Sequence, residues 1–250
     1  MPGYYLNFFP SRLVFLLFIV FMSACEKTTE TIDINVLGKQ YFPLETGKYW
    51  IYESDSVVLR SGGTIRDTLH GFLKEEVQSS FINGSGDTVF TVHVYFKRNW
   101  SDTFTYQKSV FVSKLPNMVT RQEDNLLFTK LVFPLKTGLR FNHNQLFDEN
   151  IDIMVGGETL LDMYTDWNTR IESYNEVYNW ADKLSKKTRI RLVDEETSLD
   201  KKYYYEEYLE NIGLYKKEMI FLQDNKGGTV PLPERAVKGF YHNLLLLESK

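Results

Sequence analysis

The chain has 250 residues, of which 43% are hydrophobic and 15% are aromatic, so it is long and apolar enough to bury a sizeable core. This composition excludes an intrinsically disordered protein, because disorder requires low hydrophobicity and high net charge. The net charge is −4, and residues of both signs are interspersed. No basic stripe is present to neutralise phosphates, so we expect no binding to nucleic acid.

Residues 1–24 predict an export signal. Arg12 supplies a positive charge, residues 13–22 form a ten-residue apolar run, and the small residues Ser23 and Ala24 follow. An apolar run of about seven to fifteen residues that ends in small side chains is typical of a signal peptide, whereas a membrane-spanning helix needs roughly 20 apolar residues. We therefore expect the chain to be exported and residues 1–24 to be removed.

The segment Met22-Ser23-Ala24-Cys25 resembles the lipobox of bacterial lipoproteins, in which an apolar residue and two small residues precede a cysteine. The resemblance implies cleavage before Cys25 and attachment of a lipid to its thiol. Cys25 is the only cysteine of the chain, which also rules out an internal disulfide. The implied location is the cell envelope, with the protein anchored to a membrane through Cys25. We expect the outer membrane, on a face that the sequence leaves open.

Residues 25–40 are expected to form the lipidated cysteine and a polar tether, and residues 41–250 a single β-rich domain. The clearest strand covers residues 87–97, where Val92 and Val94 alternate with His93 and Tyr95. The other strand candidates have similar lengths and are residues 49–59, 64–77, 103–112, 126–133, 188–194, 202–209 and 214–222. Their short connections predict a mainly β fold with few helices, an antiparallel curved sheet or a barrel-like or sandwich-like domain.

One segment has the spacing of a helix. Trp167, Ile171, Tyr174, Tyr178 and Ala181 recur at intervals of three or four residues between positions 166 and 184. We therefore expect a helix here, although the segment is also rich in Asn, Ser, Tyr and Thr.

The hexapeptide FPLxTG occurs twice, at residues 42–47 and 133–138, which are 91 positions apart. Two explanations remain open: a duplication, with related halves at 41–131 and 132–250, or two uses of one device for entering a strand. In either case proline holds the preceding phenylalanine extended, and Gly47 and Gly138 suit a turn position with positive φ.

The first copy extends into FPLETGKYWIY, residues 42–52. Together with residues 203–208, residues 211–218 and the closing Gly239-Phe240, it resembles uncharacterised lipoproteins of certain Gram-negative bacteria. These proteins carry an FPL-x-x-G-x-x-W-x-Y opening and a G-[IV]-G-L-[VI]-K-x-E-like strand, in which Asn211 here replaces the first glycine. The resemblance implies an envelope lipoprotein and brings no activity with it.

The sequence contains no recognisable catalytic motif. There is no zincin helix, nucleophile elbow, P-loop or dinucleotide fingerprint, and the mature chain offers no thiolate metal ligand beyond Cys25. His143 lies in a polar segment, which predicts a surface histidine. Residues 194–196 and the pair Glu206-Glu207 offer carboxylates for glycoside hydrolysis, but adjacent residues of a strand face opposite ways. We expect no catalytic residue, no cofactor and no metal.

Five aromatic residues are the candidate binding residues, because they lie among Asp, Asn and Thr, a mixture suited to stacking sugars: Tyr164, Trp167, Tyr174, Tyr178 and Trp180. Core packing explains such clusters as well. We expect a non-enzymatic binding or structural module with an unknown envelope protein or glycan as partner. Two alternatives remain: a carrier that shelters an apolar ligand in a half-open sheet, and a hydrolase acting on envelope glycans.

Overall fold

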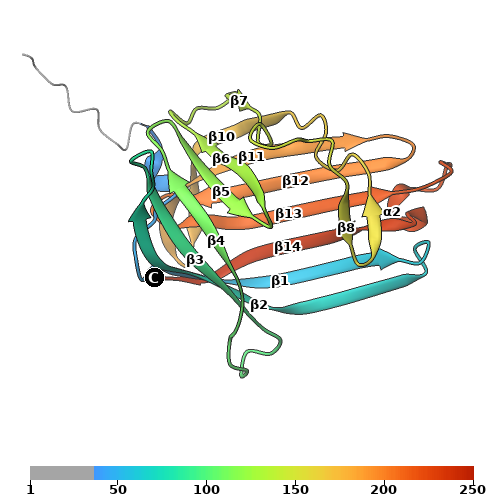
Figure 1. Cartoon of the computed structure of the whole chain (residues 1–250), viewed down its shortest axis with the longest axis horizontal. Coiled ribbons are helices and arrows are strands. Elements are labelled where there is room, and N and C mark those ends of the chain that lie inside the picture. The colour runs from blue at the N-terminus through green and yellow to red at the C-terminus, as the bar shows by residue number, and fades with distance from the viewer. Residues whose placement is uncertain (1–36) are drawn as a thin grey trace, which may run out of the picture. The chain divides into compact units, whose positions relative to one another are not determined.

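The computed structural model describes residues 37–250, so the predicted signal peptide and Cys25 lie outside the described residues. The structure consists almost entirely of antiparallel strands (Figure 1). The strands are β1 (Tyr49–Arg60), β2 (Ile65–Ile82), β3 (Thr88–Lys97), β4 (Thr105–Lys114), β5 (Met118–Glu123), β6 (Leu126–Val132), β7 (Arg140–Phe141), β8 (Ile153–Val155), β9 (Glu158–Leu160), β10 (Thr169–Trp180), β11 (Lys183–Glu196), β12 (Asp200–Leu209), β13 (Gly213–Gln223) and β14 (Lys238–Ser249). The helical segments are η2 (Lys39–Tyr41) and α2 (Leu232–Arg235).

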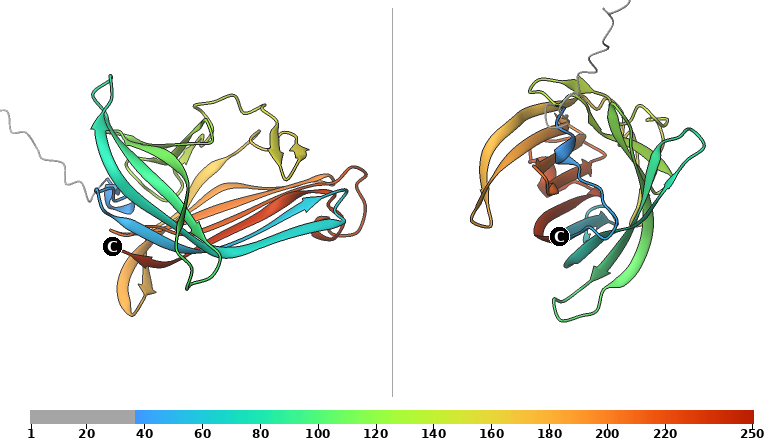
Figure 2. Two further views of the ribbon diagram at one scale, coloured as in Figure 1. Left: turned by 60° about the horizontal axis from the view of Figure 1, so that its bottom comes forward. Right: turned by 90° about the vertical axis from the view of Figure 1, so that its left-hand side faces the viewer.

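Twelve strands form one sheet in the order β6-β5-β4-β3-β2-β1-β14-β13-β12-β11-β10-β7, and β8 and β9 form a separate hairpin. The sheet curls until its two end strands approach each other, as the end-on view in Figure 2 shows. At this seam the Thr129 N–H donates a hydrogen bond of 2.8 Å to the carbonyl of His143. The predicted mainly β, antiparallel and barrel-like fold is confirmed.

Alternation along the strands determines what faces the interior of this barrel. On β3, Val92 and Val94 are buried, while His93 between them contacts the ring of Tyr106 at a centroid distance of 5.2 Å. The strand predictions correspond to β1, β2, β3, β4, β6, β11, β12 and β13. The strand predictions do not include the very short β7, β8 and β9, nor β5, which has only six residues, nor β14, whose run of four leucines shows no alternation.

The predicted helix at residues 166–184 is wrong, because most of this segment forms strand β10. The pairing of β10 with β11 shifts register twice, between Ile171 and Ser173 and between Ser173 and Glu176. Asn175 adopts a positive φ of 61° within the second shift. Each bulge inserts an extra residue into the alternation, and the resulting spacing of apolar residues imitates a helical period.

The two FPLxTG segments end in the same turn. The N–H of Gly47 donates 2.8 Å to the carbonyl of Val77, and the N–H of Gly138 donates 2.8 Å to the carbonyl of Ile171. In both copies the same strand residue, Val77 or Ile171, donates a hydrogen bond of 2.9 Å from its own N–H to the carbonyl of the residue that follows the glycine. Both glycines have the predicted positive φ, 88° and 85°.

The two turns precede two meanders of six strands each, β1–β6 and β7 with β10–β14. The first strands of the meanders, β1 and β7, each pair with the next strand of their own meander, β2 and β10. This arrangement fits both the duplication and the repeated strand-entry device, so the choice between them stays a prediction.

The chain ahead of β1 crosses one end of the barrel, where Figure 2 shows it in blue. The carbonyl of Leu37 accepts 3.0 Å from the N–H of Leu135, and that of Gln40 accepts 2.9 Å from the N–H of Asn211. Tyr41 is fully buried behind them. The sequence predicts residues 37–40 to belong to the tether, but these contacts make them part of the folded domain, and they close this end of the barrel.

Candidate functional site

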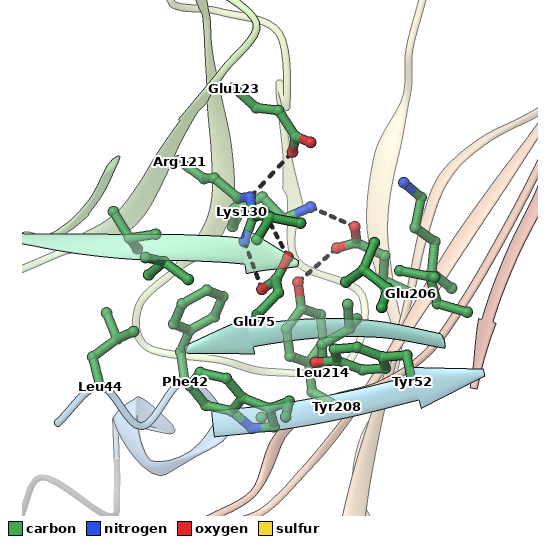
Figure 3. Close-up of a pocket in the computed structure, with 18 of the residues that line it drawn as sticks. Phe42, Leu44, Tyr52, Glu75, Arg121, Glu123, Lys130, Glu206, Tyr208 and Leu214 are labelled. Atoms are coloured by element: carbon green, nitrogen blue, oxygen red, sulfur yellow. Dashed lines mark hydrogen bonds and ion pairs between the residues drawn. The ribbon is translucent and has the colours of Figure 1, made fainter. Parts of the chain in front are cut away.

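A partly open cavity of about 220 Å³ lies in the barrel behind the segment that crosses its end (Figure 3). Native interiors are close-packed and contain few voids larger than a water molecule. The cavity also exceeds the roughly 150 Å³ that suffices to hold benzene in an engineered protein core. A void of this size is therefore the strongest candidate for a binding site in the described part of the chain.

One wall of the cavity is apolar. Its side chains come from the crossing segment and from the inner faces of β1, β2, β3, β4, β13 and β14, and they are Phe42, Leu44, Trp50, Leu73, Val92, Val94, Val112, Leu214 and Leu244. The indole N–H of Trp50 donates to the carbonyl of Ile212, so its polar atom is engaged outside the cavity. This wall offers a ligand dispersion contacts and no polar partner.

The opposite wall is charged and begins with Arg121 on β5. Its guanidinium donates two hydrogen bonds, of 3.0 and 2.6 Å, to the carboxylate of Glu75 on β2, and a third of 3.1 Å to Glu123. Glu123 also pairs with Lys108 at 2.9 Å. Burial by itself would raise the pKa of Glu123. The positive charges of Arg121, Lys217 and Lys108 have the larger effect and hold this pKa well below its usual range. Lys108 also contacts the exposed Asp124, which places this ion pair where the cavity wall meets solvent.

A second network surrounds Glu206 on β12. One carboxylate oxygen accepts from the ammonium of Lys130 and from the hydroxyl of Tyr204, and the other accepts 2.6 Å from the hydroxyl of Tyr208. Burial raises the pKa of Glu206, but Lys130, His143 and these hydrogen bonds lower it to about 2. The pKa of both tyrosines is raised well above the usual value, first by burial and then by the carboxylate. Glu206 is therefore ionised and fully engaged.

Three other polar side chains line the cavity without a hydrogen bond to any described residue: Tyr52, Lys217 and His242. Lys217 lies on β13, with its Nζ 5.4 Å from the ring centroid of Tyr204. Burial lowers its pKa; the charges of Glu123 and Glu206 oppose this shift, and those of Lys130 and Arg121 add to it. Burial and the neighbouring Lys217 lower the pKa of His242 to about 3, so this imidazole is neutral. These groups have hydrogen-bonding capacity that the protein leaves unused.

The structure places the five predicted aromatic residues in two regions, and none of them lines the cavity. Tyr164 and Trp167 are buried in a cluster of rings, where Trp167 stacks on His143 at 5.6 Å. Tyr174 contacts Tyr41 at a centroid distance of 5.8 Å. The hydroxyl of Tyr178 lies 2.8 Å from that of Tyr215, and Trp180 packs against the edge of the core. The five residues do not form one site, and their role in sugar binding stays a prediction.

His143 is not the surface histidine that its polar surroundings predicted. It is 2% exposed, and burial together with the charge of Lys130 lowers its pKa to about 3. The loop that carries it lies against the ring cluster at the seam, and a local polar composition does not report such long-range packing.

A group of possible metal ligands lies on the outer surface. Glu53, Asp55 and His70 present ligand atoms within 4.8 Å of one another. His70 Nδ1 is 2.7 Å from Asp55, so an ordinary exposed His–Asp pair explains the arrangement.

Sequence reasoning missed the cavity, but a signal for it exists. Glu75 lies two positions from Leu73 and from Val77, and Glu206 two positions from Tyr204 and from Tyr208. Side chains two apart on a strand share a face, so each carboxylate occupies a core-facing position. Charged residues are almost never buried unless they are paired. A charge at a core-facing position therefore indicates a polar site inside the barrel.

Comparisons with protein-family models, with curated proteins and with solved structures found no match. Within residues 37–250, the helices are too short and too polar to cross a bilayer.

Proposed function

We propose that this protein is a lipoprotein of the bacterial cell envelope, anchored through Cys25, whose barrel binds a small amphiphilic molecule. The observation that carries the proposal is the cavity of about 220 Å³, with an apolar wall facing a wall of ordered charges. A purely structural module has no need of such a void, because filling it would add dispersion contacts and stability.

The glycan hydrolase is the weaker candidate. A glycosidase needs one carboxylic acid whose pKa is raised so that it can protonate the leaving group. Glu123 and Glu206 instead have lowered pKa values, because neighbouring cations and hydrogen bonds stabilise their ionised forms. The bidentate ion pair with Arg121 likewise occupies both oxygens of Glu75. These carboxylates order the wall and are poorly suited to proton transfer.

Calorimetric titration of the lipidated protein in nanodiscs with decanol and decanoate tests the proposal, with empty nanodiscs as the blank. We expect saturable binding of at least one of these compounds. Leu73→Trp, which fills the cavity, should weaken it by about tenfold or more, equivalent to about 1.4 kcal/mol. Phe72→Trp is the matched control, because the neighbouring side chain faces the other side of β2 and contacts Trp100 there. Equal binding by Leu73→Trp and the wild type would place the ligand elsewhere.

A further inference from the structure

The charges of the cavity are incompletely neutralised. Among the lining residues, the cations Lys108, Arg121 and Lys130 each have an ion pair with a carboxylate. Lys217 lines the same cavity and has neither an ion pair nor a hydrogen bond within residues 37–250. Glu123 and Glu206 stabilise its charge only from a distance, and an ammonium in a cavity without a direct ion pair is costly, so this position favours the arrival of an anion.

The nearest carboxylate along the sheet does not serve as that counter-ion. Glu206 lies directly opposite Lys217 in the pairing of β12 with β13. Its oxygens are already occupied by Lys130, Tyr204 and Tyr208, as the dashed lines in Figure 3 show for Lys130 and Tyr208. The ring of Tyr204 offers Lys217 a cation–π contact, and the charge of Glu123 acts on it from a distance without forming an ion pair.

We propose that the ligand is an amphiphilic monocarboxylate whose carboxylate pairs with Lys217 and whose apolar chain lies against Phe42, Leu73 and Leu214. This inference rests on the proposed ligand-binding function and names the class of its ligand. Hydrogen bonds from the hydroxyl of Tyr52 and from the neutral imidazole of His242 complete the recognition, since both line the cavity and lack a protein partner. His242 is the diagonal neighbour of Lys217 on the inner face, because Leu244 pairs with Lys217 and His242 with Met219.

The charge balance selects a carboxylate over other head groups. One cation without a partner matches one negative charge, whereas a phosphate monoester brings about −1.5 to −2 and would leave charge uncompensated. A cationic ligand would meet Lys217 as a like charge. A neutral alcohol would leave the ammonium unpaired, although it would gain the same contacts with the apolar wall.

The first test is the head-group preference of the wild-type lipoprotein in nanodiscs, measured by calorimetry with decanoate, decanol, decylamine and decyl phosphate. We expect decanoate to bind at least tenfold more tightly than each of the others. Comparable affinities for decanoate and decanol would overturn the carboxylate assignment and leave the cavity as a general apolar site. If neither decanoate nor decanol binds, the proposed ligand-binding function fails as well.

The second test removes the charge. Lys217→Met should lower the affinity for decanoate at least tenfold and leave that for decanol unchanged, while Lys217→Arg should retain most of the preference. Lys216→Met is the matched control, because the adjacent lysine does not line the cavity and forms its ion pair with Glu218. If folded Lys217→Met binds decanoate as tightly as the wild type, Lys217 does not pair with the carboxylate. If this variant does not fold, the head-group series with the wild type decides whether the site prefers a carboxylate.

Discussion

The charged side chains inside this barrel show how burial determines ionisation at the scale of single residues. Where a buried charge has partners, as Glu206 has with Lys130, Tyr204 and Tyr208, the ionised form persists and the pKa is about 2. Where a buried histidine has no counter-ion, the neutral form persists, as it does at His143 and His242, whose pKa values are about 3. Partners, rather than residue type, therefore decide which groups carry charge in the cavity.

The two histidines predict a loss of stability in mild acid. Their pKa is near 6.5 in the unfolded chain and about 3 in the folded one, so as the pH falls through this window only the unfolded chain takes up their protons. Each histidine then lowers the free energy of unfolding by about 1.4 kcal/mol per pH unit. No stability is lost above pH 6.5, and the loss grows as the pH falls toward the folded pKa of about 3.

Urea unfolding of the wild type between about pH 6 and pH 4 measures this slope. His143→Phe, which keeps the stack on Trp167, and His242→Phe should each make the slope shallower by roughly one proton. His70→Phe is the control, since the side chain of His70 is exposed. An unchanged slope in both buried variants would show that other groups, such as Glu123 or Glu206, govern acid unfolding.

At the scale of elements, the same turn occurs twice, each time at the end of an FPLxTG motif. Proline, leucine and glycine lead the chain into β1 and β7, and each glycine hydrogen-bonds to a fully buried residue, Val77 or Ile171. The neighbourhood of Gly47 is open, with nothing within 4 Å of where a Cβ would stand. The need for glycine here comes from backbone conformation alone.

Gly47→Val and Gly138→Val should each destabilise the domain by about 1–3 kcal/mol, because a β-branched residue is strained at positive φ. Denaturant midpoints of the two variants measure the effect. Gly84→Val is the control, since Gly84 also lies in open space at a turn but does not have a positive φ. Unchanged midpoints together with weaker ligand binding would show that these segments act as a functional surface.

At the scale of the whole molecule, two meanders of six strands surround one cavity, and the segment ahead of β1 closes one end of it. The proposed lipidation site, Cys25, precedes this segment in the sequence, so the proposed anchor and the closing segment belong to the same N-terminal part of the chain. Phe42 and Leu44 belong to both the closing segment and the cavity lining.

Cys25→Ser should abolish the membrane anchor, because serine lacks the thiol that accepts the lipid. We expect the variant to incorporate no labelled palmitate and to leave the membrane fraction or to remain unprocessed. Acyl labelling and fractionation of cells measure both effects, with the neighbouring Ser23→Ala as a control that preserves a small residue at the cleavage site. Equal labelling of Cys25→Ser would contradict the lipoprotein assignment.

The sequence by itself was sufficient for the features that depend on neighbours in the chain. Alternation such as Val92 and Val94 against His93 identified strands, and the FPLxTG motif predicted positive φ at Gly47 and Gly138, because side-chain direction and turn conformation are local properties. The same local reasoning failed at β10, where two bulges disturbed the alternation.

Only the tertiary structure decided which residues form the cavity. Lys130 and Glu206 are 76 positions apart, and Arg121 and Glu75 are 46 apart, yet each pair meets inside the barrel. Curling of the sheet brings them together, and the curl depends on strand order and register across the whole chain. The unpaired state of Lys217 likewise follows from where every other charge lies, and no pattern along the sequence records it.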